Sequence, residues 1–161
     1  MLLVVVKSDS EEVVKRARRA VGGLELLPGL YLTWTPRERL AKAVEALKRE
    51  IIKRWDAEGR GPTLEVAVLP LTEEQYRELR PMARAVVEEA AESLLAEMDR
   101  LLEAMRSGKR RGEGLLGWYR DVASRYQKLV DASVALDIEP TVMGRLREKW
   151  KEVSLEAGRL R

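Results

Sequence analysis

The chain has 161 residues, of which 30 are Lys or Arg and 27 are Asp or Glu, and its formal net charge at pH 7 is +3. A chain of this length forms one domain or a small domain with an appendage, and it buries enough surface to fold without covalent cross-links. It contains no cysteine and no histidine, which excludes disulfides, thiolate chemistry, and the commonest general base and metal ligand.

The composition also bears on the source of the protein. The chain has no asparagine and only two glutamines, Gln75 and Gln127, while 35% of its residues are charged. Few thermolabile side chains together with abundant Glu, Lys and Arg indicate a heat-adapted source. A GC-rich genome, which favours Arg, Ala, Gly and Leu, is the alternative explanation.

Basic and acidic residues are unevenly distributed. Basic residues exceed acidic ones by 13 to 9 in residues 1–60 and by 13 to 8 in residues 106–161, whereas residues 61–105 hold 4 basic and 10 acidic residues. Two basic segments therefore flank an acidic one. No apolar run approaches the roughly 20 residues of a membrane helix, and the run that opens the chain is too short for a secretion signal. We expect a cytoplasmic protein with no membrane partner.

The first half of the chain alternates strand and helix signals. Residues 2–6 are a continuous aliphatic run, typical of a strand buried on both faces. The segment 8–12 offers capping oxygens for a helix that ends at Gly22-Gly23. Pro28-Gly29 predicts a hairpin turn between two short strands within residues 24–34.

A second helix and a fourth strand follow. Thr35-Pro36-Arg37-Glu38 predicts a helix start in which Thr35 caps and Glu38 bonds back to the cap. The apolar stripe of that helix consists of Leu40, Ala43, Val44, Leu47, Ile51 and Trp55. Residues 59–62 end it, and residues 64–69 read as a strand. The order β-α-β-β-α-β predicts an α+β fold in residues 1–71, a ferredoxin-like four-stranded antiparallel sheet with two helices on one face.

Residues 72–161 predict a helical extension of about three helices. Thr72 and Gln75 form a capping box, and Pro81 either kinks the helix or opens a new one. The three expected apolar stripes, the third beginning after Glu139-Pro140, are Val86, Ala90, Leu94, Met98, Leu101 and Met105; Leu115, Trp118 or Tyr119, Val122, Tyr126, Leu129, Ser133 and Leu136; and Val142, Leu146, Trp150, Val153, Ala157 and Leu160. We expect the extension to pack on the first domain or on a second subunit, as a homodimer through the C-terminal helices.

Two sets of cations are candidate binding sites for nucleic acid or another anion. The first set lies between two helices and consists of Arg106, Lys109, Arg110 and Arg111. The second set, on the first helix, consists of Lys15, Arg18 and Arg19. The alternative for the first set is a solvated turn that suits the negative end of the preceding helix, and for the second an ordinary wet helix face.

Other residue classes give no catalytic or metal site. Trp34, Trp55, Trp118 and Trp150 could stack on bases, but each falls on or beside an apolar stripe, which favours packing inside the protein. Asp9 follows the first strand without a second carboxylate fixed near it, so a metal site is unsupported. The chain has no nucleophile–base pair and no Gly-rich phosphate loop. We expect a non-catalytic protein that uses no cofactor.

One family resemblance spans nearly the whole chain. The segment Gly23-x5-Gly29-Leu30-Tyr31-Leu32, residues 40–52, residues 65–69 and Arg125-Tyr126…Leu136-Asp137 are similar to successive segments of the chromate-resistance protein B N-terminal family. The resemblance implies a regulator or accessory protein rather than an enzyme. Tyr31, Tyr126 and Asp137 are the positions that match individually, and we expect them to be structural.

Two hypotheses follow. In the first, the protein is a non-catalytic regulator whose basic residues bind DNA or an oxyanion, with binding that weakens steeply as salt is added. In the second, it is a protein-interaction or dimerisation module with long amphipathic helices and no role with nucleic acid, whose affinity resides in apolar surface.

Overall fold

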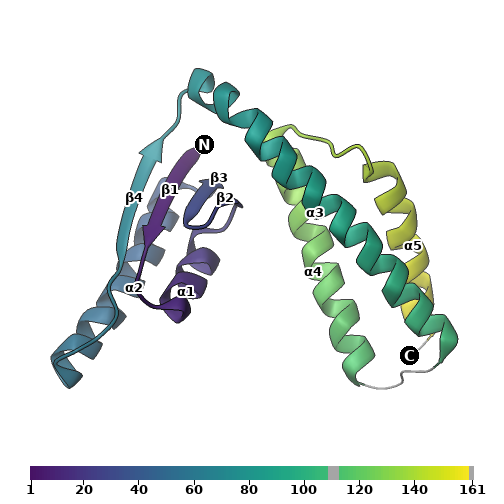
Figure 1. Cartoon of the computed structure of the whole chain (residues 1–161), viewed down its shortest axis with the longest axis horizontal. Coiled ribbons are helices and arrows are strands. Elements are labelled where there is room, and N and C mark those ends of the chain that lie inside the picture. The colour runs from purple at the N-terminus through teal and green to yellow at the C-terminus, as the bar shows by residue number, and fades with distance from the viewer. Residues whose placement is uncertain (109–112, 160–161) are drawn as a thin grey trace. The chain divides into compact units, whose positions relative to one another are not determined.

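The structure is a computed structural model that describes residues 1–108 and 113–159. Within these residues four strands form one antiparallel sheet and five helices make up most of the rest, so the predicted α+β class is confirmed (Figure 1). The elements are β1 (Leu2–Lys7), α1 (Glu11–Val21), β2 (Leu24–Leu27), β3 (Leu30–Thr33), α2 (Arg37–Glu58), β4 (Glu65–Pro70), α3 (Glu73–Ser107), α4 (Glu113–Leu136) and α5 (Met143–Arg159). They form two compact units, unit 1 (Met1–Ala83) and unit 2 (Arg84–Arg161), and the dividing point lies inside α3.

The sheet of unit 1 has the strand order β2-β3-β1-β4, with every neighbouring pair antiparallel. β1 and β3 are central, while β2 and β4 form the two edges. β1 pairs with β4 without interruption, from Leu2 opposite Pro70 to Lys7 opposite Glu65. Because side chains alternate between the two faces of a strand, this register fixes which residues share a face.

The predicted hairpin is confirmed. β2 and β3 pair across the Pro28-Gly29 turn, with a bulge between Glu25 and Leu27. Gly29 has a φ of +81°, which favours glycine. Its carbonyl accepts a 2.8 Å hydrogen bond from the amide of Val6, so the turn extends the ladder between β3 and β1.

Two helices cover one face of the sheet. α1 begins where Ser10 accepts a hydrogen bond from the amide of Val13, and it buries Val13, Ala17 and Val21 at intervals of one helical turn. Leu40 and Leu47 of α2 are buried in the same core. The core cluster beneath the two helices comprises Leu2, Val4, Val6, Ala17, Val21, Tyr31, Leu40 and Leu47.

The predicted cap of α2 is wrong. α2 begins at Arg37 with Pro36 as its N-cap residue, and no side chain caps it. Thr35 instead donates its hydroxyl to the carbonyl of Val21 at 3.2 Å, and the buried hydroxyl of Thr33 donates to the same carbonyl at 3.1 Å. The two threonines therefore satisfy the last turn of α1 rather than the first turn of α2.

α3 is one helix of 35 residues, with Pro81 inside it. Its capping box is confirmed, because Thr72 and Gln75 exchange hydrogen bonds of 3.2 and 2.9 Å. The predicted apolar stripe is correct from Leu94 onward. In the turns that precede Leu94, the buried positions lie one residue later than predicted. Ala91 is fully buried and Ala90 is exposed, so the first turns of the stripe are Ala83, Val87 and Ala91.

The other two stripes are largely buried in α4 and α5, up to Ala157. Leu160, the last residue of the third predicted stripe, lies outside the described residues. Trp150 of α5 stacks between two rings of α4, with centroids 5.7 Å from Tyr119 and 5.0 Å from Tyr126. Between the helices, Asp137 adopts a positive φ of 51°, and Thr141 donates two hydrogen bonds to Glu88 of α3. The predicted break before α5 is thus confirmed, and the connection is fixed to α3.

Candidate functional site

The predicted cations of α1 divide into paired and free side chains. Arg18 forms an ion pair with Glu25 of β2, and its neighbour Arg16 forms one with Glu50 of α2. Lys15 and Arg19 are exposed, and no carboxylate in residues 1–108 and 113–159 pairs with either. Half of the positive charge on this helix face is therefore neutralised inside unit 1.

The predicted cations after α3 are only partly described. Arg106, near the end of α3, lies 3.4 Å from a carboxylate oxygen of Glu152 on α5. Lys109, Arg110 and Arg111 lie outside the described residues. As far as it is described, this set consists of one arginine that joins two helices of unit 2.

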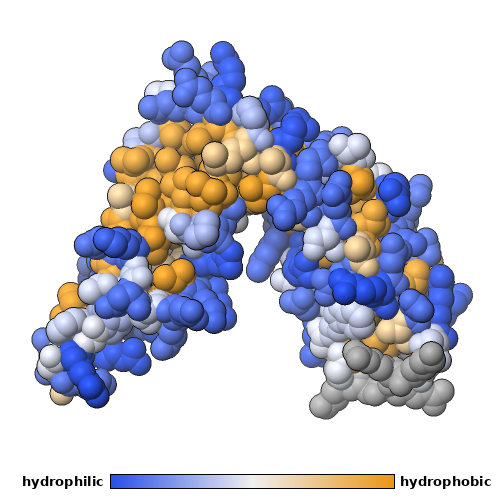
Figure 2. All heavy atoms as spheres, viewed as in Figure 1, coloured by the Kyte–Doolittle hydropathy of each residue, from blue (hydrophilic) through white to orange (hydrophobic). Residues whose placement is uncertain are grey.

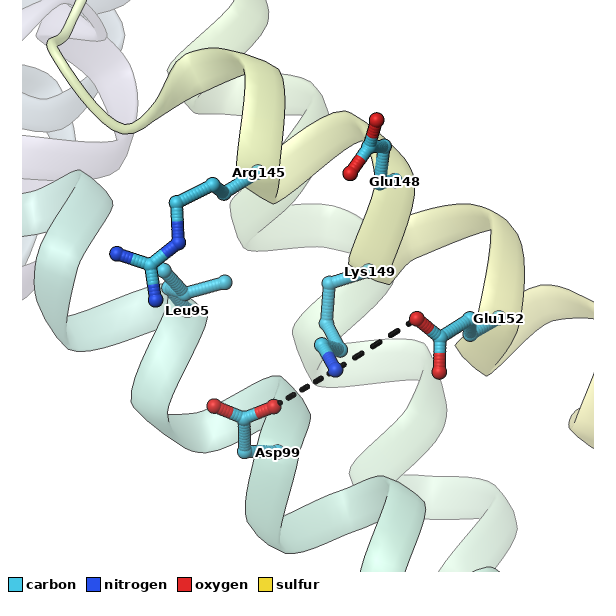
Figure 3. A pocket seen from close by; sticks show the side chains of 6 residues that line it. All are labelled: Leu95, Asp99, Arg145, Glu148, Lys149 and Glu152. Carbon is cyan, nitrogen blue, oxygen red and sulfur yellow. Dashed lines mark ion pairs between the residues drawn. The ribbon is translucent and has the colours of Figure 1, made fainter.

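A depression of about 210 Å³ on unit 2 is lined by charged side chains of α3 and α5. Figure 3 shows the Lys149 amine between two carboxylates, 3.1 Å from Asp99 and 3.6 Å from Glu152. The hydrogen bond to Asp99 raises the pKa of Lys149 above its usual value. The network joins α3 to α5, because Asp99 belongs to α3 and Lys149 to α5.

Glu97 of α3 forms the second charged junction of unit 2. Its carboxylate accepts hydrogen bonds from Arg125 and, at 3.0 Å, from the indole nitrogen of Trp118, both on α4. The bond from Arg125 is the main cause of a pKa below the usual value for this carboxyl. Trp118 thus has a structural partner, as predicted for a packed rather than base-stacking tryptophan.

Replacing Glu97 by glutamine is expected to lower the free energy of unfolding of unit 2 by about 1 kcal/mol at pH 7. A carboxyl with a lowered folded-state pKa stabilises the fold above its unfolded-state pKa of about 4.3, and loses that effect as pH falls through the folded-state value. The difference between the wild type and Glu97→Gln should therefore narrow as the pH falls below about 4. Urea unfolding at pH 7, 5 and 3.5 checks this, and a gap that stays constant with pH would contradict it.

No described residues form a metal site. Residues 1–108 and 113–159 contain no group of three Asp or Glu side chains that could hold a metal ion. Asp9 accepts a 2.8 Å hydrogen bond from the amide of Thr63, and Ser8 donates to the Thr63 carbonyl at 2.6 Å. These bonds fix the segment before β4 to the end of β1.

Within residues 1–108 and 113–159, no helix has both the length and the apolar character needed to cross a lipid bilayer.

Tyr31 of β3 lies in the core of unit 1. Tyr31 is 1% exposed within the core under α1 and α2. Its burial raises the pKa of the phenol, against a smaller lowering effect of Arg18. A phenol that remains protonated at neutral pH cannot act as a base.

The second face of the sheet carries apolar side chains that remain exposed. β1 and β4 alternate, so Leu3, Val5, Ala67 and Leu69 share the face opposite to α1 and α2. Val5 is 40% and Leu69 is 50% exposed, Ala67 is exposed and Leu3 is half-buried. We call these four residues the open strip. Figure 2 shows hydrophobic side chains gathered over this face of the sheet.

The open strip contradicts the prediction that β1 is buried on both faces. The alternate positions Leu2, Val4 and Val6 are all buried, whereas Val5 between them is not. On β3, Leu32 of the second face is fully buried, whereas Leu27 of β2, which pairs with Leu30 on the same face, is 53% exposed. The exposed apolar region is therefore largest on the β1–β4 side and recurs at the β2 edge. The sequence contained a signal for this exposure. The strands of unit 1 are apolar on both faces, but α1 and α2 cover only one of these faces.

Two other shallow depressions flank Ile51 of α2 in unit 1. One of the two is lined by the paired Arg16 and Glu50, and neither gathers a set of convergent polar groups. Comparison with known proteins gives no further guide, because no family model, no curated protein and no solved structure matches the chain.

Proposed function

We propose that this protein is a protein-interaction module whose binding surface is the open strip of the sheet. One observation carries the proposal: Val5 and Leu69, on adjacent strands, are 40% and 50% exposed although both are large apolar side chains. Burying the exposed part of each side chain against a partner is worth about 1 kcal/mol. An apolar patch on an otherwise highly charged protein is typical of an interaction site.

The finer architecture is part of this proposal. We infer that unit 1 is a ferredoxin-like domain and that the helices of unit 2 are its extension. The element order β-α-β-β-α-β and the strand order β2-β3-β1-β4 support this inference. In this arrangement the two helices of unit 1 cover one sheet face and leave the other uncovered by that unit.

A second candidate function is the binding of DNA or an oxyanion by a regulator, as the resemblance to the chromate-resistance protein B N-terminal family implies. Lys15 and Arg19 support it, because they lie one turn apart on the exposed face of α1 with no described carboxylate partner. The ion pairs of Arg18 and Arg106 weigh against it, since a phosphate would have to compete with Glu25 and Glu152. The interaction module is therefore our first proposal.

A photo-reactive amino acid at position 67 tests the interaction module in the native cells of the protein. Ala67 is exposed within the open strip, so irradiation is expected to give one adduct of defined mass. The same residue at position 53, which is exposed on α2, is the matched control and should give none. Adding Val5→Glu should abolish the adduct, because a carboxylate in the strip is costly to bury.

The outcomes of this experiment separate clearly. An adduct that depends on position 67 and is lost with Val5→Glu supports the proposal, whatever its mass. Absence of an adduct, or equal adducts at positions 67 and 53, contradicts it.

A gel shift tests the second candidate. Charge reversal of Lys109, Arg110 and Arg111 is expected to abolish retention of DNA, and raising the salt concentration should weaken the wild-type complex steeply. Reversal of Lys48, Arg49 and Lys53, exposed on α2, is a control that changes the net charge equally. Retention that is unaffected by the first triple substitution rules out this function for the segment after α3.

A further inference from the structure

We propose that the open strip binds the open strip of a second copy of this chain, with a two-fold axis that runs between β1 and β4 and parallel to them. This inference rests on the proposed function and names its partner. A two-fold axis in this position lays β1 of each copy over β4 of the other, because rotation exchanges the two strands. Val5 then faces Ala67 of the second copy, and Leu3 faces its Leu69.

The β4 edge of the sheet is a poor alternative for self-association. The amide of Leu71 donates to the carbonyl of Met1 at 3.1 Å, so by alternation residues 65, 67 and 69 also direct their backbone groups to β1. Residues 66, 68 and 70 therefore direct theirs to the free edge. Pro70 has no N–H, which leaves only Val66 and Val68 as donors on that edge, and proline at this place hinders pairing with another strand.

The charges around the strip favour a second copy over a charged partner. The strip itself has no ionisable group, and the next pair along the same face is Lys7 and Glu65, whose charged atoms lie 3.9 Å apart. Both side chains are largely exposed. With the axis between β1 and β4, Lys7 of each copy faces Glu65 of the other. The same surface is thus complementary to itself in charge as well as in apolar character, as a two-fold interface requires.

The size of the strip determines how tight this dimer is. Two strands are about 10 Å wide and six residues are about 20 Å long. Two such surfaces bury much less than the roughly 1,200 Å² of a standard stable interface. We therefore expect a dimer that dissociates when it is diluted into the micromolar range.

Sedimentation velocity on the purified full chain tests the dimer between about 10 µM and 1 mM. The wild type is expected to shift from monomer to dimer across this range. Leu69→Glu and, as a second variant against a folding defect of the first, Ala67→Glu should remain monomeric. Ile52→Glu is the matched control, since Ile52 is an apolar residue of α2 that is 57% exposed, and it should associate as the wild type does.

A charge exchange tests the arrangement. Lys7→Glu alone and Glu65→Lys alone should each weaken association at least ten-fold, because each places like charges opposite each other. An equimolar mixture of the two variants should regain wild-type association, since the carboxylate introduced at position 7 of one chain then faces the amine introduced at position 65 of the other. Pairing within one chain cannot give this recovery, because both variants retain like charges on adjacent strands.

A wild type that is monomeric at all concentrations overturns the inference, as does association that survives Leu69→Glu and Ala67→Glu. A mixture that fails to recover overturns the placement of the axis. The proposed function fails separately: an adduct at position 67 with a different protein supports an interaction module and contradicts self-association, whereas no adduct contradicts the module itself.

Discussion

Gly23→Ala is expected to lower the free energy of unfolding of unit 1 by at least about 3 kcal/mol. Gly23 precedes β2 with a φ of +79°, which L side chains rarely adopt. A Cβ at this position would overlap the carbonyl oxygen of Leu32 and lie 2.8 Å from the Cα of Thr33. These are backbone atoms of a central strand, so β3 would have to move to accommodate the methyl group.

Gly59→Ala is the matched control for this prediction. Gly59 has a φ of +65° at the end of α2, and no atom lies within 4 Å of a Cβ built there. Its substitution carries the backbone strain without the overlap, so we expect a loss of about 1 kcal/mol. Urea unfolding followed by circular dichroism measures both variants. Equal losses would show that the close approach to β3 is not decisive.

Leu101→Ala should lower the free energy of unfolding of unit 2 by about 2–5 kcal/mol. Leu101 is fully buried in the stripe of α3, between the buried residues Met98 and Met105. Removing three of its carbons deletes apolar contacts and leaves a cavity that the surrounding helices fill only partly. In a Trp34→Phe, Trp55→Phe background, the tryptophan fluorescence during urea unfolding reports unit 2, because the remaining Trp118 and Trp150 belong to α4 and α5.

The corresponding control is Leu155→Ala on α5. Leu155 is 70% exposed, so the same loss of volume leaves no cavity, and the free energy of unfolding should change by less than about 0.5 kcal/mol. A similar loss from Leu101→Ala and Leu155→Ala would mean that α3 does not form the core of unit 2.

Local signals in the sequence were sufficient for much of the fold. The Pro28-Gly29 turn, the capping box of Thr72 and Gln75, and the break at Glu139-Pro140 all depend on residues within four positions of each other. Sequence patterns of this kind predict the local backbone structure well, because the hydrogen bonds that stabilise it form between neighbouring residues.

Predictions that depended on tertiary context were less successful. Thr35 has the sequence pattern of a helix cap, but the last carbonyl groups of α1 compete for its hydroxyl. Val5 stands in an aliphatic run typical of a doubly buried strand, and its exposure depends on how many helices the rest of unit 1 provides. From the sequence Arg18 is expected to be an unpaired cation, but in the folded hairpin Glu25 lies beside it and forms an ion pair. In each case the deciding partner lies outside the element that carries the signal, and periodicity within one element does not reveal it.

Pro81 interrupts the backbone hydrogen bonds of α3. It supplies no N–H to the carbonyl of Arg77, and it stands two residues before the end of unit 1 at Ala83. The helix is therefore weakest close to where the two compact units divide. Amide protons on either side of this turn should exchange with solvent as two separate cooperative groups, each following the opening of its own unit rather than that of the helix they share.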